Sequence, residues 1–355
     1  MAGLKIALVN GIKPIAGSGD GITEYAYNMY LQLGKRNEVI PVYSISASRK
    51  NDVHGLLKVN SYLSRKVRSA VEKKPDILHI VNQEVGFAAK DSKTTDSGLP
   101  VATTIHDISR FEVGLHRGVL QKAYNIMVQR SIMQSIRNSD LLLFDSSQTM
   151  AETRRRFDIG RHAVVNIGIG KKFSAPKRTK RSDRFTVGYI GSFAYHKNVI
   201  MLLRAARELG DAGIMFSVYG IGNEASSLAE YRERNGMRWV GLNGFAAESR
   251  KVAIYDTFDV FAFPSLYEGF GLPILEAMAR GLPVVIYKKG KIPKEVRKYC
   301  IEAADESHMA QIISELRERG YGAKRRAEAM AYARGFTWER CAEETLKAYG
   351  GILGR

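Results

Sequence analysis

The sequence has little cysteine, no long apolar run and nothing like a signal peptide. Its two cysteines, Cys300 and Cys341, match no metal-ligand spacing, and we expect two reduced thiols, as in a cytosolic protein. No run approaches the ~20 apolar residues that a membrane-spanning helix needs. A strand begins at once near Lys5, without the basic region, apolar run and cleavage site of a secretory signal. The sequence therefore predicts a soluble, non-exported, cytoplasmic protein.

Acidic residues are also scarce relative to basic ones. The chain has 54 Lys and Arg against 36 Asp and Glu, a net charge of +18. The excess is dispersed, because residues 1–175 carry 25 basic and 15 acidic residues and the remainder carries 29 and 21. Such a surface attracts nucleotides, anionic lipids and nucleic acids alike. Charge alone does not choose among these partners.

Short apolar runs alternate with helix-length amphipathic segments along the chain, which is typical of parallel α/β sheets. The expected strands are Lys5–Val9, Val39–Tyr43, Asp76–Ile80, Val101–Ile105, Leu141–Phe144 and Val164–Ile167, then Thr186–Ile190, Met215–Tyr219, Arg238–Val240, Val260–Phe263 and Val284–Ile286. Residues 171–184 are polar and basic and are expected to form a linker. The pattern therefore predicts two doubly wound domains, 1–170 and 185–335, with ligands bound at the carboxyl ends of their strands.

Two glutamates flank a glycine-containing turn after the strand at 260–263. Glu268 and Glu276 are separated by seven residues. Pro273 suits the first position of a helix, and Gly281 suits the position just past its end. Free N–H groups at such a helix start bind phosphate, and the helix dipole favours an anion. With carboxylates on either side to hold hydroxyls, the turn predicts a site for a nucleotide or a sugar phosphate.

Two other glycine-containing turns follow strands. Gly17–Gly21 precedes a helical pattern but lacks both the P-loop ending and the spacing of a dinucleotide fingerprint, and a plain flexible turn is the alternative. Gly191 begins the second turn, which ends at Lys197 directly before a helix. A cation there opposes the helix dipole unless an anion binds beside it. Phosphate binding is favoured over a solvated lysine.

A histidine and an aspartate, His106 and Asp107, end the expected strand at 101–105. A histidine at the carboxyl end of a buried strand lies where a ligand is expected, and a neighbouring carboxylate can orient it. An equally good interpretation is a helix-capping aspartate beside a bystander histidine. His79 ends the preceding strand, where it could line the same cleft, but a lone histidine is more often structural.

One stretch, Leu56–Lys74, combines a helical apolar stripe with many basic residues. The stripe consists of Leu56, Val59, Leu63, Val67, Ala70 and Val71, and the charge comes from Lys58, Arg65, Lys66, Arg68, Lys73 and Lys74. Such a helix can lie on an anionic membrane. The alternative, slightly favoured, is a stripe that faces the protein core beneath a solvated basic face.

The frame Glu268-Gly-Phe-Gly-Leu-Pro-x-x-Glu276-Ala resembles the signature of the retaining glycosyltransferases of family 4. The resemblance covers nearly the whole chain and includes Thr104-Ile-His-Asp107 and the turn from Gly191 to Asn198. It implies the GT-B fold, two Rossmann-like domains facing across a cleft, with residues 336–355 forming a helix that crosses back to the first domain. It also implies hexose transfer from a nucleotide diphosphate sugar to an acceptor hydroxyl, with retention, no metal and no cofactor.

The resemblance implies a role for each residue of the motifs. Glu276 would hold the ribose hydroxyls of the donor, and Glu268 and His106 would contact the transferred sugar. The remaining donor-binding residues would be Gly21, Ser192, Lys197, Phe270, Gly271 and Leu272. Ser192 is a departure, because many members of the family carry arginine there to neutralise the leaving diphosphate.

Two alternatives stand beside this interpretation. A sugar-nucleotide epimerase has the same fold, but the paired glutamates and the Lys197 turn match the transferase pattern. A basic nucleic-acid-binding protein would explain the charge and leave the glutamates unexplained, so we expect no nucleic acid partner. The basic stretch leads us to expect an anionic or lipid-linked acceptor and peripheral contact with the inner face of the membrane.

Overall fold

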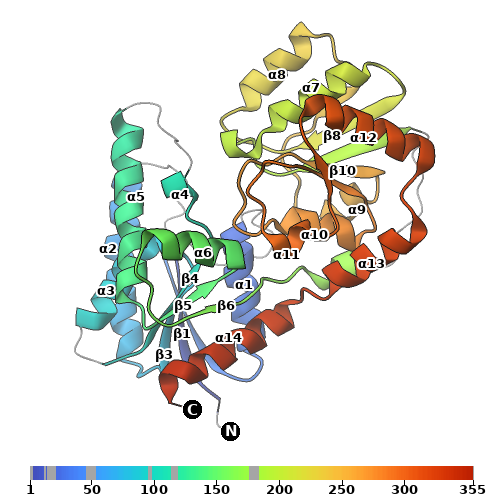
Figure 1. The fold of residues 1–355 in the computed structure, drawn as a ribbon. Helices are drawn as coiled ribbons and strands as arrows, with labels where there is room; N and C mark the ends of the chain where they lie inside the picture. Colours follow the sequence, from blue (N-terminus) through green and yellow to red (C-terminus); the bar gives the residue numbers. More distant parts are fainter. Residues whose placement is uncertain are drawn as a thin grey trace. The chain divides into compact units, whose positions relative to one another are not determined.

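The structure is a computed structural model that describes residues 3–11, 13, 21–44, 53–94, 98–112, 119–175 and 184–354. For residues 53–58, 60, 91–94, 112 and 119–121 only the backbone is described. The chain divides into two compact units (Figure 1). Unit 1 comprises Met1–Gly168 and Trp338–Arg355, and unit 2 comprises Ile169–Thr337.

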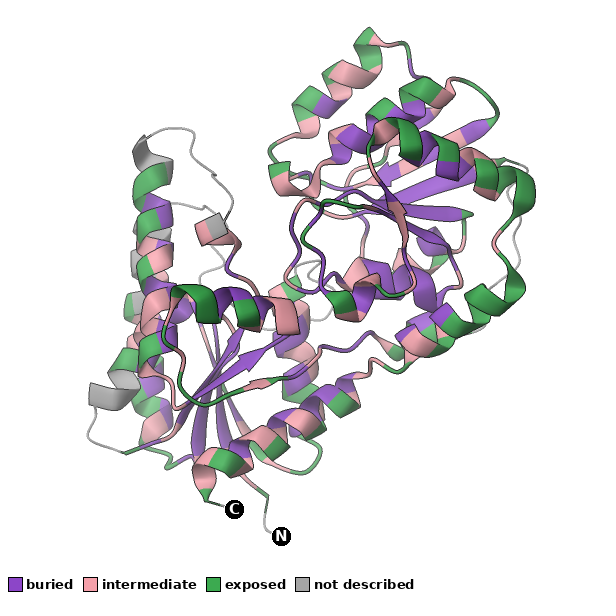
Figure 2. Ribbon diagram, viewed as in Figure 1, coloured by how far each residue is buried: buried purple, intermediate pink, exposed green. Residues whose placement is uncertain are grey.

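Unit 1 is built on a six-stranded parallel sheet in the order β2-β1-β3-β4-β5-β6. The strands are β1 (Lys5–Asn10), β2 (Glu38–Tyr43), β3 (Ile77–Ile80), β4 (Val101–Ile105), β5 (Leu141–Phe144) and β6 (His162–Val164). Residues of β3, β4 and β5 are buried throughout, as Figure 2 shows. A strand buried on both faces is continuously apolar rather than alternating, which explains why these strands are clear in the sequence.

Helices cover both faces of this sheet (Figure 1). They are α1 (Gly21–Leu33), α2 (Val53–Val71), α3 (Phe87–Thr94), α4 (Ser109–Glu112), α5 (Val119–Asn138), α6 (Ser147–Arg156) and α14 (Trp338–Leu353), with a short 3-10 helix η1 (Gln83–Val85). Helices α2, α3 and α5 pack against one another in one layer, and α1 and α14 pack together in another. The C-terminal helix therefore completes the unit that the N-terminus begins, as the family resemblance implied.

Unit 2 has a second six-stranded parallel sheet, in the order β12-β11-β10-β7-β8-β9. The strands are β7 (Phe185–Ile190), β8 (Ile214–Tyr219), β9 (Val240–Leu242), β10 (Val260–Phe263), β11 (Val284–Tyr287) and β12 (Ile301–Ala303). Renumbered from β7, this is the order 6-5-4-1-2-3 of a Rossmann sheet, with its switch point between β7 and β10. A ligand is expected at the carboxyl ends of these two strands.

The helices of unit 2 also form two layers (Figure 1). They are α7 (Val199–Leu209), α8 (Ala225–Arg234), α9 (Lys251–Tyr255), α10 (Leu272–Ala279), α11 (Lys294–Arg297), α12 (Glu306–Arg319) and α13 (Ala323–Arg334), with 3-10 helices η2 (Lys171–Ser174) and η3 (Tyr195–Lys197). Helix α7 packs against α8 and α12, and α10 packs against α13.

The predicted fold class is confirmed, with local errors at strand ends. The strand expected at Val164–Ile167 is β6, which ends at Val164, and that expected at Arg238–Val240 is β9, which begins at Val240. Strand β12 was not predicted, because three residues at a sheet edge carry too little pattern. Of the expected linker, Lys171–Ser174 form η2 within unit 2, and residues 176–183 lie outside the described residues.

Candidate functional site

The loops that follow β7 and β10 meet at the switch point of unit 2 and bring Lys197 and Glu268 together. The ammonium group of Lys197 donates to both carboxylate oxygens of Glu268, each at 2.8 Å. Both side chains are largely buried, at 18% and 7% exposure. The ammonium also lies 5.8 Å from the ring centroid of Phe263. Two residues that are 71 positions apart in sequence thus form one charged centre.

Two hydrogen bonds hold these two loops together. The Leu266 amide donates to the His196 carbonyl at 2.7 Å, and the Asn198 side-chain amide donates to the Pro264 carbonyl at 3.2 Å. Asn198 itself is left-handed, with φ 52° and ψ 38°, a conformation that asparagine tolerates better than most residues. This residue ends η3 and starts α7, so the position of Lys197 follows from the turn geometry.

Helix α10 begins as the sequence predicted, directly after the glycine turn. Gly271 has φ +99°, which residues with a side chain rarely adopt, and Pro273 lies in the first turn. The amides of Phe270, Gly271 and Leu272 donate no hydrogen bond within the described part of the chain. Three donors at the positive end of a helix form a site suited to an anion.

Glu276 lies one turn into α10 and is 5% exposed. The Tyr255 hydroxyl donates to its Oε2 at 2.8 Å, and the Lys251 ammonium lies 3.6 Å from its Oε1. Burial raises the pKa of Glu276, although Lys251 opposes the shift. The structure therefore holds this carboxyl group in an oriented and weakly solvated position.

Ser192 is exposed, and its carbonyl oxygen accepts a hydrogen bond from Tyr189 at 2.9 Å. Its side chain brings no charge to the turn after β7. Lys197 is therefore the cation that this turn supplies next to Glu268.

In unit 1, both ring nitrogens of His106 have partners within the protein. Nδ1 lies 2.6 Å from Asp145 Oδ2, and Nε2 lies 2.8 Å from the Val81 carbonyl oxygen. Both partners are acceptors, so both nitrogens carry protons. Burial alone would lower the pKa of His106, but Asp145 and the Val81 carbonyl raise it to about 9. His106 is thus a buried imidazolium, bridging the loops after three neighbouring strands.

His79 belongs to a separate hydrogen-bonded chain beside His106. Its Nε2 lies 2.8 Å from the Thr104 hydroxyl, which in turn lies 3.1 Å from the Tyr25 hydroxyl. Its Nδ1 lies 2.6 Å from the Tyr349 hydroxyl on α14. Burial, together with His106, lowers the pKa of His79 to about 3. The structural interpretation of His79 is the one that the geometry supports.

We expect these two histidines together to contribute most to the stability of unit 1 near pH 6.5. The raised pKa of His106 contributes stability that is complete below pH 6.5 and is lost as pH rises toward about 9. The lowered pKa of His79 contributes stability that is complete above pH 6.5 and is lost as pH falls toward about 3. Each slope is at most ~1.4 kcal/mol per pH unit.

Denaturant unfolding between pH 6 and pH 9 measures the alkaline slope. Asp145→Asn should flatten it, because the imidazolium loses its carboxylate, whereas Asp158→Asn at an exposed position of the same unit should leave it unchanged. An alkaline slope that is equally steep in Asp145→Asn would contradict the assignment to His106.

The remaining predicted features lie apart from these groups or outside the description. Gly21 is exposed and starts α1, but residues 14–20 of its loop lie outside the described residues.

In α2, Leu63, Val67 and Ala70 are buried in the core of unit 1, so the core-facing interpretation of this stripe is confirmed. Val59 and Val71 pack against the same core, so the described part of this apolar face is turned away from solvent. No described helix is long and apolar enough to cross a bilayer.

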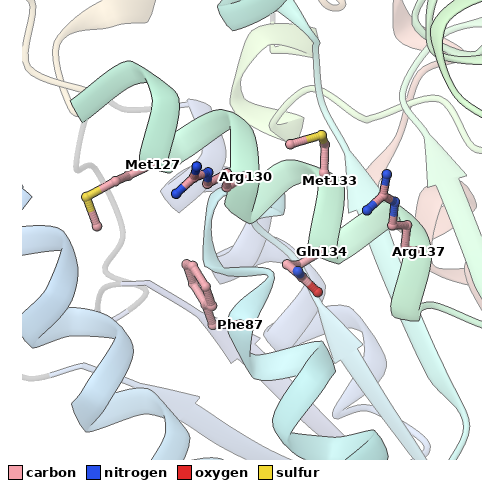
Figure 3. A pocket seen from close by; sticks show the side chains of 6 residues that line it. All are labelled: Phe87, Met127, Arg130, Met133, Gln134 and Arg137. Atoms are coloured by element: carbon pink, nitrogen blue, oxygen red, sulfur yellow. The ribbon is translucent and has the colours of Figure 1, made fainter. Parts of the chain in front are cut away.

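A cavity of about 390 Å³ lies on the α3–α5 layer of unit 1 (Figure 3). It is lined by Phe87, Met127, Arg130, Met133, Gln134 and Arg137. None of the predicted site residues lines it. Within the described residues there is no cluster of three or more metal-binding side chains.

Comparison with known proteins agrees with this architecture. Residues 184–319 match the family described as glycosyl transferases group 1. Sucrose-phosphate synthase from Thermosynechococcus elongatus has the same fold, with a TM-score of 0.80 at 17% identity over 98% of this chain and 99% of that one. Anabaena HepE, solved in complex with UDP-glucose, has a TM-score of 0.71 at 18% identity over 98% of this chain and 100% of that one.

Curated sequences point the same way. O-antigen chain mannosyltransferase B of Escherichia coli is 27% identical over 267 residues, 70% of this chain and 69% of that protein. Glycogen synthase of Mycobacterium tuberculosis is 25% identical over 288 residues, 78% of this chain and 69% of that protein. The matches place the chain in the GT-B glycosyltransferase superfamily.

Proposed function

We propose that this protein is a retaining, metal-independent hexosyltransferase that uses a nucleotide diphosphate sugar as donor. One observation carries the proposal: the Lys197–Glu268 pair lies at the switch point of unit 2, in the strand order where a Rossmann sheet binds nucleotides. The free amides at the start of α10 follow Glu268 within four residues. Retention and the choice of a hexose rest on the resemblance to family 4.

The donor diphosphate would bind the amides of Phe270, Gly271 and Leu272. Lys197 has three ammonium protons, of which Glu268 takes two, so one remains for a phosphate oxygen. When the glycosidic bond breaks, its electron pair stays on the diphosphate, and negative charge grows there. Preorganised donors in a dry site stabilise that charge more in the transition state than in the ground state.

Each remaining site residue has a part in this proposal. Glu276 would accept hydrogen bonds from the ribose hydroxyls, and Glu268 would contact the transferred sugar while holding Lys197. His106, as an imidazolium, would donate a hydrogen bond to the sugar. Its Nε2–H would have to leave the Val81 carbonyl oxygen to do so. Gly21 and Ser192 have no bulky side chain, so the backbone at these two positions would be able to approach the phosphates of the donor.

A donor screen tests the proposed function. A nucleotide sugar at 100 times its Kd should stabilise the protein by ~2.7 kcal/mol, seen as a thermal shift. Incubation with an acceptor should release nucleoside diphosphate, whereas an epimerase would convert the sugar of the intact donor. A filter-binding assay with salt titration checks the nucleic-acid alternative, which predicts salt-sensitive retention of DNA or RNA without donor turnover.

Replacing Glu276 by Ala should weaken donor binding and preserve the fold, because charge-assisted hydrogen bonds to two hydroxyls are lost. We expect a loss of at least tenfold in donor affinity by calorimetry. Glu230→Ala is the control, since Glu230 is an exposed carboxylate of the same unit, paired only at the surface with Arg234. Equal donor affinity in both variants would disprove the ribose assignment.

We further propose that the acceptor is anionic or lipid-linked and that unit 1 contacts anionic membranes through charge alone. Arg65, Lys66 and Arg68 are exposed on α2, and neither α2 nor α5 contains an acidic residue. Each basic residue near an anionic surface contributes ~1 kcal/mol. The attachment would be reversible and salt-sensitive, because it would rest on charge rather than on an inserted apolar face.

Co-sedimentation with anionic and neutral vesicles tests this surface. The protein should pellet with anionic vesicles at low salt and remain in the supernatant at high salt. Changing Arg65, Lys66 and Arg68 to Gln should reduce pelleting, whereas the same charge loss at exposed Lys289, Arg319 and Lys324 of unit 2 should have a smaller effect. A protein that stays in the supernatant at low salt would favour an acceptor in solution.

A further inference from the structure

Helix α9 holds the carboxylate of Glu276 through two side chains. Tyr255 donates to Oε2 at 2.8 Å, and the Lys251 ammonium lies 3.6 Å from Oε1. Lys251 and Tyr255 are four residues apart, so both project from one face of the short helix. Each oxygen of Glu276 therefore has its own neighbour, and the plane of the carboxylate is set by two points of contact.

Tyr255 is immobilised by its surroundings. Its side chain is fully buried, and its ring centroid lies 5.9, 6.1 and 5.4 Å from those of Phe173, Phe258 and Phe261. Burial raises the pKa of Tyr255 well above its usual value, so the phenol stays protonated and remains a donor. The hydroxyl thus reaches Glu276 from a position that packing defines.

Lys251 is held by a second carboxylate. Its ammonium lies 2.7 Å from Glu248 Oε2, and Lys172 lies 2.5 Å from Glu248 Oε1. Burial alone would raise the pKa of Glu248, but Lys251 and Lys172 lower it. Positive and negative groups therefore alternate from Lys172 through Glu248 and Lys251 to Glu276.

We propose that Tyr255 and Lys251 are positioning residues that orient Glu276 toward a vicinal diol, so that the donor site selects nucleotides with intact ribose 2′- and 3′-hydroxyls. A carboxylate has about four lone-pair sites, and Tyr255 uses one of them. Sites remain on both oxygens for two adjacent hydroxyls. The inference rests on the proposed function, because it assigns the partner of Glu276 to the ribose of a donor nucleotide.

Calorimetric titration with UDP, GDP and the 2′,3′-dideoxy form of each nucleotide tests this role on the full chain. Tyr255→Phe removes the one hydroxyl and keeps the packed ring. The matched control is Tyr231→Phe in α8, because the buried Tyr231 hydroxyl has no hydrogen-bond partner within the described residues. Glu276→Ala is measured in parallel.

For whichever ribonucleotide binds, Tyr255→Phe should weaken affinity about tenfold, ~1.4 kcal/mol, and should leave affinity for the dideoxy form unchanged. Tyr231→Phe should change neither. In the background of Glu276→Ala, Tyr255→Phe should have no further effect, because its action passes through the carboxylate.

Equal weakening of the ribose and dideoxy forms by Tyr255→Phe would overturn the proposal, since a general structural role has that signature. No weakening of either form would also overturn it. If instead Glu276→Ala leaves ribonucleotide affinity unchanged, the result contradicts the proposed donor site itself. The two failures are therefore distinguishable.

Lys251 provides an independent measurement. Lys251→Gln removes the cation that opposes the upward pKa shift of Glu276, so the pKa of Glu276 should rise further. As pH falls, the carboxylate should then be protonated earlier, and the preference for the ribose form over the dideoxy form should be lost at a higher pH than in wild type. Lys251→Arg should restore the wild-type pH profile. The same pH profile in wild type and Lys251→Gln would refute the role of Lys251.

Discussion

Replacing Lys197 by Ala should lower turnover by roughly 100- to 1,000-fold, while donor affinity falls much less. The expected loss corresponds to ~3 kcal/mol, the size of effect seen when a preorganised group that stabilises developing charge is removed. Lys197 is 18% exposed and bound to Glu268, so little solvent is present to replace its charge. Steady-state kinetics with separate kcat and KM values make the measurement.

The control for Lys197 is Lys289→Ala, an exposed lysine of the same unit. It removes the same formal charge without touching the switch point, and it should keep wild-type turnover. Lys197→Arg should recover only part of the activity, because a guanidinium does not reproduce the compact ammonium between two carboxylate oxygens. A Lys197→Ala variant with raised KM and unchanged kcat would show that the lysine serves ground-state binding alone.

Replacing Arg280 by Met should destabilise unit 2 by about 3–5 kcal/mol, because the change leaves a partly buried carboxylate without its guanidinium. Arg280 is 3% exposed at the end of α10. Its Nε and Nη2 each donate to Asp256, at 2.9 Å, and its Nη1 donates to the carbonyls of Phe173 and Ala175. Denaturant unfolding followed by fluorescence measures the loss.

Two further variants test whether the destabilisation comes from the unpaired Asp256 carboxylate rather than from the removal of an arginine in general. Arg234→Met breaks an exposed pair with Glu230 and should cost less than ~1 kcal/mol. Asp256→Asn combined with Arg280→Met should be less destabilising than Arg280→Met alone, since no buried charge is left over. A loss under 1 kcal/mol in Arg280→Met would show that Asp256 finds another partner.

The fold could be predicted because its strongest signals are local. Runs such as Leu141–Phe144 are apolar at every position, and the turn at Gly271 combines a helix-starting proline with a backbone angle suited to glycine. Elements with a weak local signal were missed for the same reason, because a strand such as β12 has only three residues and one buried side chain. Strand order, by contrast, comes from packing of remote segments and has no signal in a single run.

The candidate residues could be named from the sequence, but their hydrogen-bond partners could not. Lys197 was singled out by its place before a helix start, Glu268 by its place beside a glycine-containing turn, and His106 by its place at a strand end. Asp145 also follows a strand directly, so the same rule applied to β5 would have found the partner of His106. Tyr255 gave no signal, because a tyrosine on a five-residue helix looks like any core residue until tertiary structure brings it against Glu276.

The return of α14 to unit 1 has a consequence for synthesis on the ribosome. Unit 1 contains both His79 and its hydrogen-bond partner Tyr349, which are 270 residues apart. At roughly 5–20 residues per second, Tyr349 is added about 15–50 s after His79. The whole of Ile169–Thr337 is translated in that interval, so unit 2 has all of its residues before unit 1 does. Unit 1 therefore begins to emerge first but is the last to obtain all of its residues. Until α14 is made, the faces of α1 and β5 that it covers remain exposed and accessible to chaperones.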